Sequence, residues 1–343
     1  MCNYDHGDDR YRYPGYKIVA DFSSNVPDVP SQDALWKYLV ARRDVIRHYP
    51  DPHPYALESS LSRILSVDKR CVAVTSGATD AIYLIAHLFQ NHSSVICHPT
   101  FSEYASACRL FCHSVTSLFA DDTSPFIDLP KQTQVVWLCN PNNPTGHTCD
   151  RNALLGWINA NPQVTFVVDQ SYHAFTSKPV LSPQEVVELP NCILIQSLTK
   201  SYAIPGLRLG YMVANSDILS SLSRFRMPWS VNALAIEAGL YLVQQPLPFS
   251  LDTLLQMREH LSLSLSNLDV LEVIPTDTHY FLVKMKHHKA SQVKEWLVKQ
   301  HGILVRDAST FPLLSEYHLR IATQNLSHNA LLINALSQLP GTL

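Results

Sequence analysis

The feature that most constrains the fold is a set of short apolar runs in the middle of the chain, each of which stops at a polar residue. The runs cover residues 94–97, 135–140, 164–169 and 192–198. None alternates strictly between polar and apolar residues, as a half-exposed strand would. Such runs suit a sheet that helices cover on both faces. Because helical stretches separate them, the sequence predicts an α/β fold with a mostly parallel central sheet.

Helices are expected between these runs and after the last of them. The expected helices cover residues 79–89, 103–111, 151–158 and the alanine-rich segment 232–243. After about residue 245 the pattern changes to a long helix, a strand near 279–285, a helix over 290–302, strands at 303–308 and 318–323, and a last helix. We therefore predict a large domain over 31–245, a smaller α+β domain over 246–343, and an N-terminal arm, residues 1–30, that joins the small domain.

Composition narrows the classes of partner. The 26 basic and 29 acidic residues are spread along the chain and give a net charge of −3, which argues against a nucleic-acid partner. The N-terminus lacks an apolar signal region, and no apolar stretch is long enough for a membrane span, so we expect a cytoplasmic protein. The eight cysteines form no C-x-x-C pair, which argues against a zinc ribbon and a disulfide framework. No metal is expected.

Polar residues gather where the apolar runs stop. Asp169 ends one run, Asn143 follows another, and Ser197, Thr199 and Lys200 follow a third. Ligands of open α/β sheets bind at the carboxyl ends of strands, so these groups should converge. A carboxylate at the end of a buried strand requires a positive partner. A protonated pyridine nitrogen is one such partner, and the aspartate would keep that ring cationic and hence an electron sink.

Lys200 and Arg208 point to an aldehyde that carries a phosphate. A lysine that is partly desolvated and lies near another cation has a lowered pKa, so its neutral amine can form an imine. Hydroxyls and a guanidinium suit a phosphate dianion. A second phosphate-binding feature is the segment TSGATDAI, which opens an apolar helix whose N-terminal amides favour an anion. Its residues are Ser76, Gly77, Ala78 and Thr79.

Each of these features has an ordinary alternative. The TSGATDAI segment can be a simple capped helix start, Asp169 a turn residue, and Lys200 a surface lysine. Their order and spacing favour the common site.

The ordered segments resemble a known family. The segments PTFSEY, CNPNNPTG, VVDQSY, SLTKSYAIPGLRLGY and HLRIA resemble the signature of fold type I pyridoxal-phosphate enzymes of the class I/II aminotransferase family, over nearly the whole chain. Within that class, the segments HYPDP, PWSVNALA and GILVRDASTFP, with the early DHG and DFSSN, are most similar to the threonine-phosphate decarboxylases of cobalamin synthesis. The histidinol-phosphate aminotransferases come second.

The resemblance implies roles for the residues that contact the cofactor, pyridoxal 5'-phosphate. Lys200 matches the Schiff-base lysine, and Asp169 matches the partner of the pyridine nitrogen. Asn143 and Tyr172 match the groups that hydrogen-bond the ring hydroxyl. Phe101 matches the aromatic residue that stacks on the ring, with Tyr104 as a rival. The phosphate-binding residues would be Ser76, Gly77, Ala78, Thr79, Ser197, Thr199 and Arg208.

The resemblance also implies a substrate site and a dimer. Tyr49 matches a tyrosine that reaches the phosphate of the neighbouring subunit, so we expect a homodimer with shared active sites. Arg320 matches the arginine that binds the substrate carboxylate, and Asn143 belongs to the same substrate site. His6, Asn25 and Arg306 match positions that help bind the substrate's own phosphate.

The chain departs from the family pattern at four places. Asp8 stands where the pattern has a second glycine, and SSNVPDVP replaces an Asn-Pro segment. Asp169 is followed by Gln170, Ser171 and Tyr172 in place of Glu-Ala-Phe, and Tyr172 is the aminotransferase-like choice. His279, Tyr280 and Phe281 replace Ala-Asn-Phe. These departures concern specificity and leave the cofactor-binding pattern intact.

The favoured function is decarboxylation of O-phospho-L-threonine to (R)-1-amino-2-propanol O-phosphate. The alternative is an aminotransferase that acts on histidinol phosphate or a similar amino acid. A third alternative, from another class, is a non-catalytic protein that keeps the fold. The two activities share the cofactor and differ in which bond at the α-carbon lies perpendicular to its ring.

Overall fold

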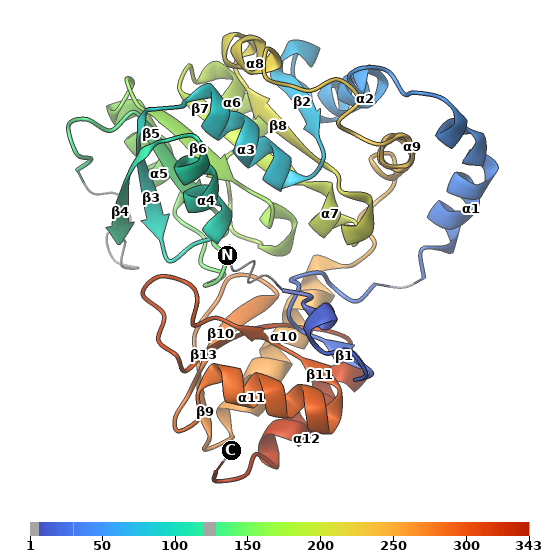
Figure 1. Ribbon diagram of the computed structural model, residues 1–343, viewed down its shortest axis with the longest axis vertical. Coiled ribbons are helices and arrows are strands. Elements are labelled where there is room, and N and C mark those ends of the chain that lie inside the picture. Colours follow the sequence, from blue (N-terminus) through green and yellow to red (C-terminus); the bar gives the residue numbers. More distant parts are fainter. Residues whose placement is uncertain (1–6, 30, 120–127, 343) are drawn as a thin grey trace.

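The computed structural model describes residues 7–29, 31–119 and 128–342 (Figure 1). Its large sheet has the strand order β2-β8-β7-β6-β5-β3-β4. The strands β7, β6, β5, β3 and β4 are parallel, whereas β8 runs antiparallel to β2 and β7. The predicted α/β fold is therefore confirmed. In sheet order the strands are Val72–Thr75, Gly210–Ala214, Cys192–Ser197, Thr165–Asp169, Val135–Cys139, Ser93–His98 and Ser114–Phe119.

The apolar runs lack polar positions because both faces of the sheet are covered. In β5, Val136 and Leu138 pack into one core cluster, while Val135, Trp137 and Cys139 pack into the other. Helices α3 (Ala78–Leu88), α4 (Ser102–Leu110) and α8 (Ser216–Ser223) cover the second face. The first face is covered by α1 (Asp33–Ala41), α2 (Tyr55–Leu65), α5 (Arg151–Ala160), α6 (Pro183–Glu188) and α9 (Ala233–Leu242).

A smaller sheet, with the order β12-β13-β10-β9, forms the lower lobe in Figure 1. Helix α11 is followed directly by a π-helical turn, η6, at Leu297–His301. The elements are α10 (Leu251–Ser266), β9 (Leu271–Val273), β10 (Tyr280–Met285), α11 (Ala290–Trp296), β11 (Ile303–Leu304), β12 (Arg306–Asp307), β13 (His318–Ala322) and α12 (Leu326–Ser337).

The N-terminal arm is bonded to this smaller lobe. Strand β1 (Ala20–Asp21) pairs in parallel with β11, and the buried Lys294 of α11 donates to Asp9 at 2.6 Å. The expected single strand over 303–308 is wrong in detail. It divides at Val305, because β11 pairs with β1 whereas β12 pairs with β13. The domain boundaries themselves stay a prediction.

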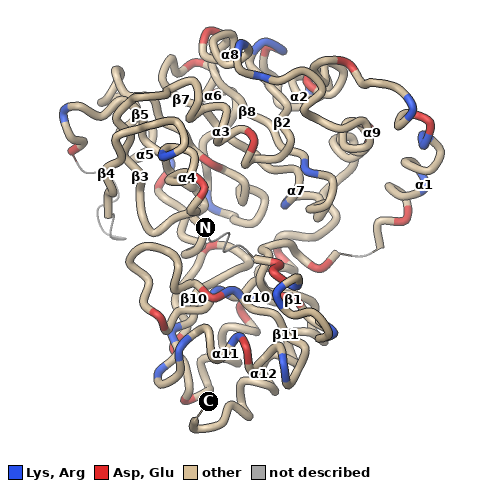
Figure 2. Tube along the Cα trace, viewed as in Figure 1, with Lys and Arg blue, Asp and Glu red and all other residues tan. Residues whose placement is uncertain are grey.

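The remaining elements are short, and one of them, α7, contributes to the site. The 3-10 turns are η1 (Arg10–Arg12), η2 (Arg43–Arg47), η3 (Lys69–Cys71), η4 (His173–Phe175) and η5 (Pro205–Leu207), and α7 covers Leu198–Ser201. Basic and acidic residues are scattered over both lobes (Figure 2). Within the described ranges, no helix is long and apolar enough to cross a membrane.

Candidate active site

A cavity of about 540 Å³ lies between the carboxyl ends of the large sheet and the small lobe. Most of the residues that the sequence singles out line it. They are Ala78, Thr79, Phe101, Asn143, Asp169, Tyr172, Ser197, Thr199, Lys200, Arg208, Arg306 and Arg320.

Lys200 enters the cavity from α7, the short helix that follows β7. Its Nζ donates a hydrogen bond to the carbonyl oxygen of Ser24, at 2.8 Å. Burial, followed by the charges of Arg320 and Arg208, lowers the pKa of Lys200 to about 8. The carboxylates of Asp21 and Asp8 act in the opposite direction. About a tenth of Lys200 is therefore the neutral, nucleophilic amine at pH 7, far more than for an ordinary lysine.

Asp169 is the last residue of β6, and both oxygens of its carboxylate accept hydrogen bonds. Its Oδ1 accepts from the Ser171 amide and hydroxyl at 2.9 and 2.6 Å, and its Oδ2 accepts from the Tyr104 hydroxyl at 2.7 Å. Burial raises the pKa of Asp169, and these donors oppose the rise. A cation on the cavity side would favour the ionised carboxylate.

Tyr104, the rival of Phe101 for stacking on the ring, donates a hydrogen bond to Asp169. It is 1% exposed and its ring packs against Trp137, with the centroids 5.8 Å apart. Phe101, at the N-cap of α4, is partly exposed and meets Tyr104 edge to face. Both residues line the cavity, and because the Tyr104 hydroxyl is held by Asp169, Phe101 is the better candidate for stacking on a ring.

The start of α3 forms the second end of the cavity. No side chain caps this helix, whose N-cap is Gly77 with a φ of +83°. A Cβ at position 77 would lie 2.8 Å from Nη2 of Arg208 and would displace the guanidinium from this place, and the positive φ itself favours glycine. Ser76 and Gly77 do not themselves line the cavity, and the Ser76 amide donates to Asp80 at 2.9 Å. They shape the turn that presents Ala78 and Thr79.

Asn143 and Tyr172 face the cavity between these two ends. The Asn143 Oδ1 accepts a hydrogen bond from Nη1 of Arg320. Burial raises the pKa of Tyr172 to about 12, against the charge of Arg320, so its hydroxyl keeps its proton and can donate.

The small lobe contributes two arginines. Arg306 and Arg320 are direct partners on the antiparallel strands β12 and β13, and they are 3% and 4% exposed. Arg306 donates to the Thr310 hydroxyl at 3.0 Å, and Nη2 of Arg320 donates to the carbonyl oxygen of Ser23. The Nε of Arg320 is buried without a hydrogen-bond partner. Burial, with the charge of Arg306 acting in the same direction, lowers the pKa of Arg320 to about 10. Two buried like charges call for an anion between them.

Two further predicted residues, Asn25 and Tyr49, do not line the cavity. Asn25 is fully buried and does not line the cavity; its amide lies beside the Tyr172 hydroxyl and acts to lower its pKa, but without the geometry of a hydrogen bond. Tyr49 is 84% exposed, with its ring 5.3 Å from that of Trp229. His6 lies outside the described residues. Asp8, in contrast, lines the cavity with a left-handed φ of +57°, which accounts for glycine in the family pattern.

Sequence reasoning missed Tyr83 and Glu103 on the cavity wall, where the Tyr83 hydroxyl donates to Glu103 at 2.8 Å. It named Tyr104 as a rival for ring stacking and Ser171 as a departure from the family pattern, and missed that both donate hydrogen bonds to Asp169. Glu103 stands in the same motif as Phe101 and Tyr104, so that motif could have indicated it. Ser24 contacts Lys200 through its backbone carbonyl oxygen, which every residue type has, so the sequence does not indicate this contact.

The chemistry of the donor set can be matched to a ligand. A lysine with a lowered pKa suits an aldehyde, a buried carboxylate suits a ring nitrogen, and an uncapped helix start beside an arginine suits a phosphate. These residues fit pyridoxal phosphate. The described residues contain no group of three histidine, cysteine or acidic side chains that could hold a metal ion.

Comparisons with known proteins agree with this fit. The sequence model of the family "Aminotransferase class I and II" matches residues 17–336. A histidinol-phosphate aminotransferase of Thermoanaerobacter pseudethanolicus is 32% identical over 94% of this chain and 93% of its own. A threonine-phosphate decarboxylase of Salmonella typhimurium is 28% identical over 93% and 90%. The crystal structure of L-threonine-O-3-phosphate decarboxylase from Porphyromonas gingivalis superposes with a TM-score of 0.89 and 37% identity, covering 93% of this chain and 98% of that one.

Proposed function

The chain belongs to the class I and II aminotransferase family, and from this premise we propose that it decarboxylates O-phospho-L-threonine to (R)-1-amino-2-propanol O-phosphate. It is a pyridoxal-phosphate-dependent enzyme. Among the solved structures, the decarboxylase from Porphyromonas gingivalis is 37% identical to this chain and a histidinol-phosphate aminotransferase from Clostridium acetobutylicum is 21% identical, which supports this choice between the two activities.

Bound pyridoxal phosphate supplies a cationic ring that accepts the electrons of a bond broken at the substrate's α-carbon. Lys200 carries the cofactor, and Asp169 keeps the ring nitrogen protonated. Ser171 and Tyr104 support this role because they hold the carboxylate in place with donors on both oxygens. Asn143 and Tyr172 donate to the ring hydroxyl, and Phe101 lies against the ring face.

The cofactor phosphate binds at the start of α3. Ala78, Thr79, Ser197 and Thr199 offer amides and hydroxyls on the cavity wall, and Arg208 offers the charge. The bare Cα of Gly77 supports this position, because a side chain there would displace the Arg208 guanidinium from the start of α3.

The observation that carries the choice of substrate is the pair Arg306 and Arg320. Both are buried, they lie opposite each other on neighbouring strands, and both line the cavity that contains Lys200. A phosphate dianion neutralises two guanidinium groups better than one carboxylate does. A substrate whose phosphate is held here is fixed at the end remote from its α-carbon.

This anchoring determines the bond that breaks. With the substrate phosphate held by Arg306 and Arg320, neither arginine would hold the carboxylate in place, and the bound cofactor would supply the electron sink for the loss of carbon dioxide. The amine of Lys200 would then return a proton to the α-carbon.

The second candidate is an aminotransferase. Two observations favour it: the identity to histidinol-phosphate aminotransferases, and the contact of Arg320 with Asn143, which would hold a carboxylate close to the ring plane. In that case the α-proton is removed, and Lys200 moves it.

One experiment separates the two. Cofactor-loaded protein is incubated with O-phospho-L-threonine and released carbon dioxide is measured; a parallel sample receives histidinol phosphate with 2-oxoglutarate and is assayed for glutamate. We expect carbon dioxide and no substantial glutamate. Efficient glutamate formation with no carbon dioxide would reject the decarboxylase and keep the cofactor assignment.

We also propose a homodimer in which Tyr49 reaches the partner's cofactor phosphate. In its own protomer the Tyr49 side chain is 84% exposed and does not line the cavity, and Trp36 and Met227 are exposed at 68% and 73%. The Tyr49→Phe variant removes one hydroxyl hydrogen bond, so it should weaken cofactor retention about fivefold without changing the protomer's fold. A monomer in sedimentation analysis, or unchanged retention in this variant, would reject the shared site.

A further inference from the structure

The loop that carries Asn143 is docked onto the small lobe. It covers residues 142–148, between β5 and α5. The Asn142 carbonyl oxygen accepts from the Gly146 amide at 2.7 Å and from the Tyr280 hydroxyl at 2.8 Å. The first bond closes the loop, and the second ties it to β10.

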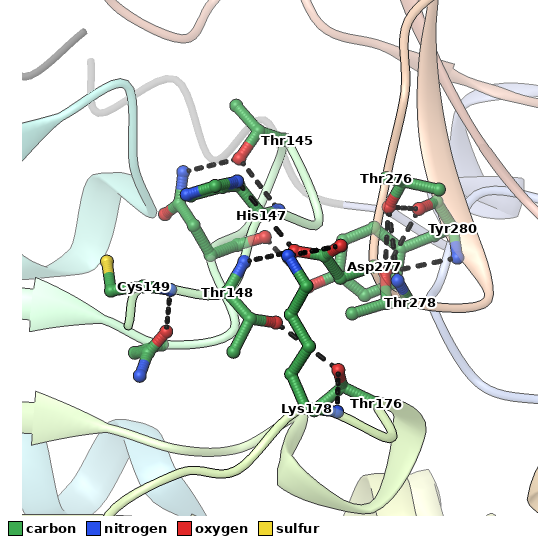
Figure 3. Close-up of polar contacts among 12 residues, drawn as sticks. Thr145, His147, Thr148, Cys149, Thr176, Lys178, Thr276, Asp277, Thr278 and Tyr280 are labelled. Carbon is green, nitrogen blue, oxygen red and sulfur yellow. Dashed lines mark hydrogen bonds and ion pairs between the residues drawn. The ribbon is translucent and has the colours of Figure 1, made fainter. Parts of the chain in front are cut away.

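Asp277 contacts this loop at two further backbone positions. Its amide donates to the Gly146 carbonyl oxygen at 3.1 Å, and its Oδ2 accepts from the Thr148 amide at 2.8 Å. Figure 3 shows Asp277 between Thr148 and Lys178, whose Nζ lies 2.9 Å from Oδ1. The His147 ring lies farther away, with Nδ1 3.7 Å from Oδ2.

The two surfaces are closely fitted. Gly146 has a φ of +73°, and a Cβ there would lie 2.0 Å from Oγ1 of Thr276 and 2.7 Å from Oγ1 of Thr278. Oγ1 of Thr276 is itself bonded to the Tyr280 carbonyl oxygen at 2.7 Å. The small-lobe turn therefore approaches the loop backbone more closely than any side chain at position 146 would allow.

We propose that Asp277 is a positioning residue, which clamps the 142–148 loop to the small lobe and so fixes Asn143 against the cofactor ring. The inference rests on the proposed contact of Asn143 with that ring. Arg320, from the same lobe, binds the Asn143 side chain directly. The loop is thus held at its backbone by Asp277 and Tyr280, and at the Asn143 side chain by Arg320. Together these contacts fix the position of Asn143 relative to Arg320.

The backbone contacts, rather than the ion pair, form the clamp. The Lys178 side chain is 51% exposed, and exposed ion pairs stabilise little. The Thr148 amide, by contrast, has Asp277 as its acceptor at the junction of the two lobes. An asparagine at 277 keeps an oxygen acceptor and loses only the charge.

The test measures the pH midpoint of the cofactor's visible absorbance in loaded protein, which depends on the groups at the ring hydroxyl. The Asp277→Ala variant should move the midpoint toward that of Asn143→Ala by about half a pH unit, the size expected for one weakened hydrogen bond. Asp277→Asn and Lys178→Met should stay near wild type. The matched control is Lys289→Met. It removes an exposed ion pair of the small lobe, in which Nζ of Lys289 lies 2.8 Å from Oε2 of Glu316.

A double variant decides whether Asp277 acts through Asn143. In the Asn143→Ala background, Asp277→Ala should add no further shift, because coupled positions are not additive. An Asp277→Ala midpoint equal to that of Lys289→Met, or the same shift in both backgrounds, overturns the proposal. If Asp277→Ala does not fold, Tyr280→Phe removes another contact to the loop, and its midpoint must move in the same direction.

The readout separates this proposal from the proposed function. It requires only bound cofactor, so the absence of decarboxylation would leave the expected shifts unchanged. An unmoved midpoint in Asn143→Ala would instead reject the ring contact of Asn143, and the clamp with it.

Discussion

On the large-domain side of the cavity, Asp169 is hydrogen-bonded by Ser171, two residues further along the chain. On the small-lobe side, Arg320 is hydrogen-bonded to Ser23 and Asn143, which are 297 and 177 residues away. The first side is thus built mainly from local motifs at strand ends, to which Tyr104 and the Ser24 carbonyl are added from elsewhere in the chain. The second side is built from segments that only the tertiary fold brings together.

The two sides also differ in charge. Asp169 has donors on both oxygens from within its own domain, whereas Arg306 and Arg320 lie side by side and the Nε of Arg320 has no partner. The cofactor side is complete without substrate, and the substrate side is complete only with an anion. Variants on the cofactor side should therefore impair every reaction, and variants on the substrate side only the binding and orientation of substrate.

The largest effect is expected for Lys200→Ala. Loss of the amine removes both the cofactor attachment and the proton donor, so carbon dioxide release should fall by at least about 10³-fold. The cofactor should still bind reversibly, because the α3 start and Asp169 remain; binding is measured by equilibrium dialysis. Lys289→Met is the control. More than trace activity would exclude Lys200 from the mechanism.

Asp169→Asn should lower the rate by about 10²–10³-fold, since a preorganised charge opposite the ring nitrogen is lost. The drop should appear in kcat and be the same for decarboxylation and for any side reaction. Tyr104→Phe, which removes one donor to this carboxylate, should lose far less. A near-normal kcat in Asp169→Asn would show that the ring nitrogen has another partner.

Arg306→Ala tests the substrate side alone. Loss of a buried charge-assisted contact costs about 2 kcal/mol, so kcat/KM for O-phospho-L-threonine should fall about thirtyfold. The cofactor's absorbance and dissociation constant should not change. An equal loss of cofactor affinity would mean that the two sides are not separable as described.

The smallest effect is expected for the pKa of Lys200. Arg320, on the substrate side, lowers this pKa and so links the two sides. In cofactor-free protein, the rate of reaction with pyridoxal phosphate should rise with pH and reach half its maximum near pH 8, because the neutral amine is the nucleophile. Arg320→Ala removes a charge that lowers this pKa, so the midpoint should move upward by less than about one unit. A midpoint near that of an ordinary lysine would contradict the effect of burial.

Several elements could be predicted from the sequence because their signal is local. The four apolar runs became β3, β5, β6 and β7, and the helices expected at 79–89, 103–111, 151–158 and 232–243 became α3, α4, α5 and α9, each beginning within one residue of the expected position. Helices α6, α7 and α8 were not expected. Strand β4 was missed because it lies at the sheet edge and is largely exposed, which leaves no apolar run. Strand β8 was missed because its residues follow the Lys200 motif directly, and its antiparallel direction depends on its neighbours β2 and β7.

The sequence by itself determined the chemistry of the cofactor side: a lysine, a carboxylate and a helix start at strand ends, where a parallel sheet always gathers its ligands. The tertiary structure alone decided the rest. It made Tyr104 a partner of Asp169, buried Asn25 beside Tyr172, brought the Ser24 carbonyl to Lys200, and docked Asp277 on the Asn143 loop. These contacts join distant segments, often through backbone atoms, and a backbone carbonyl or amide is the same in every residue that supplies it.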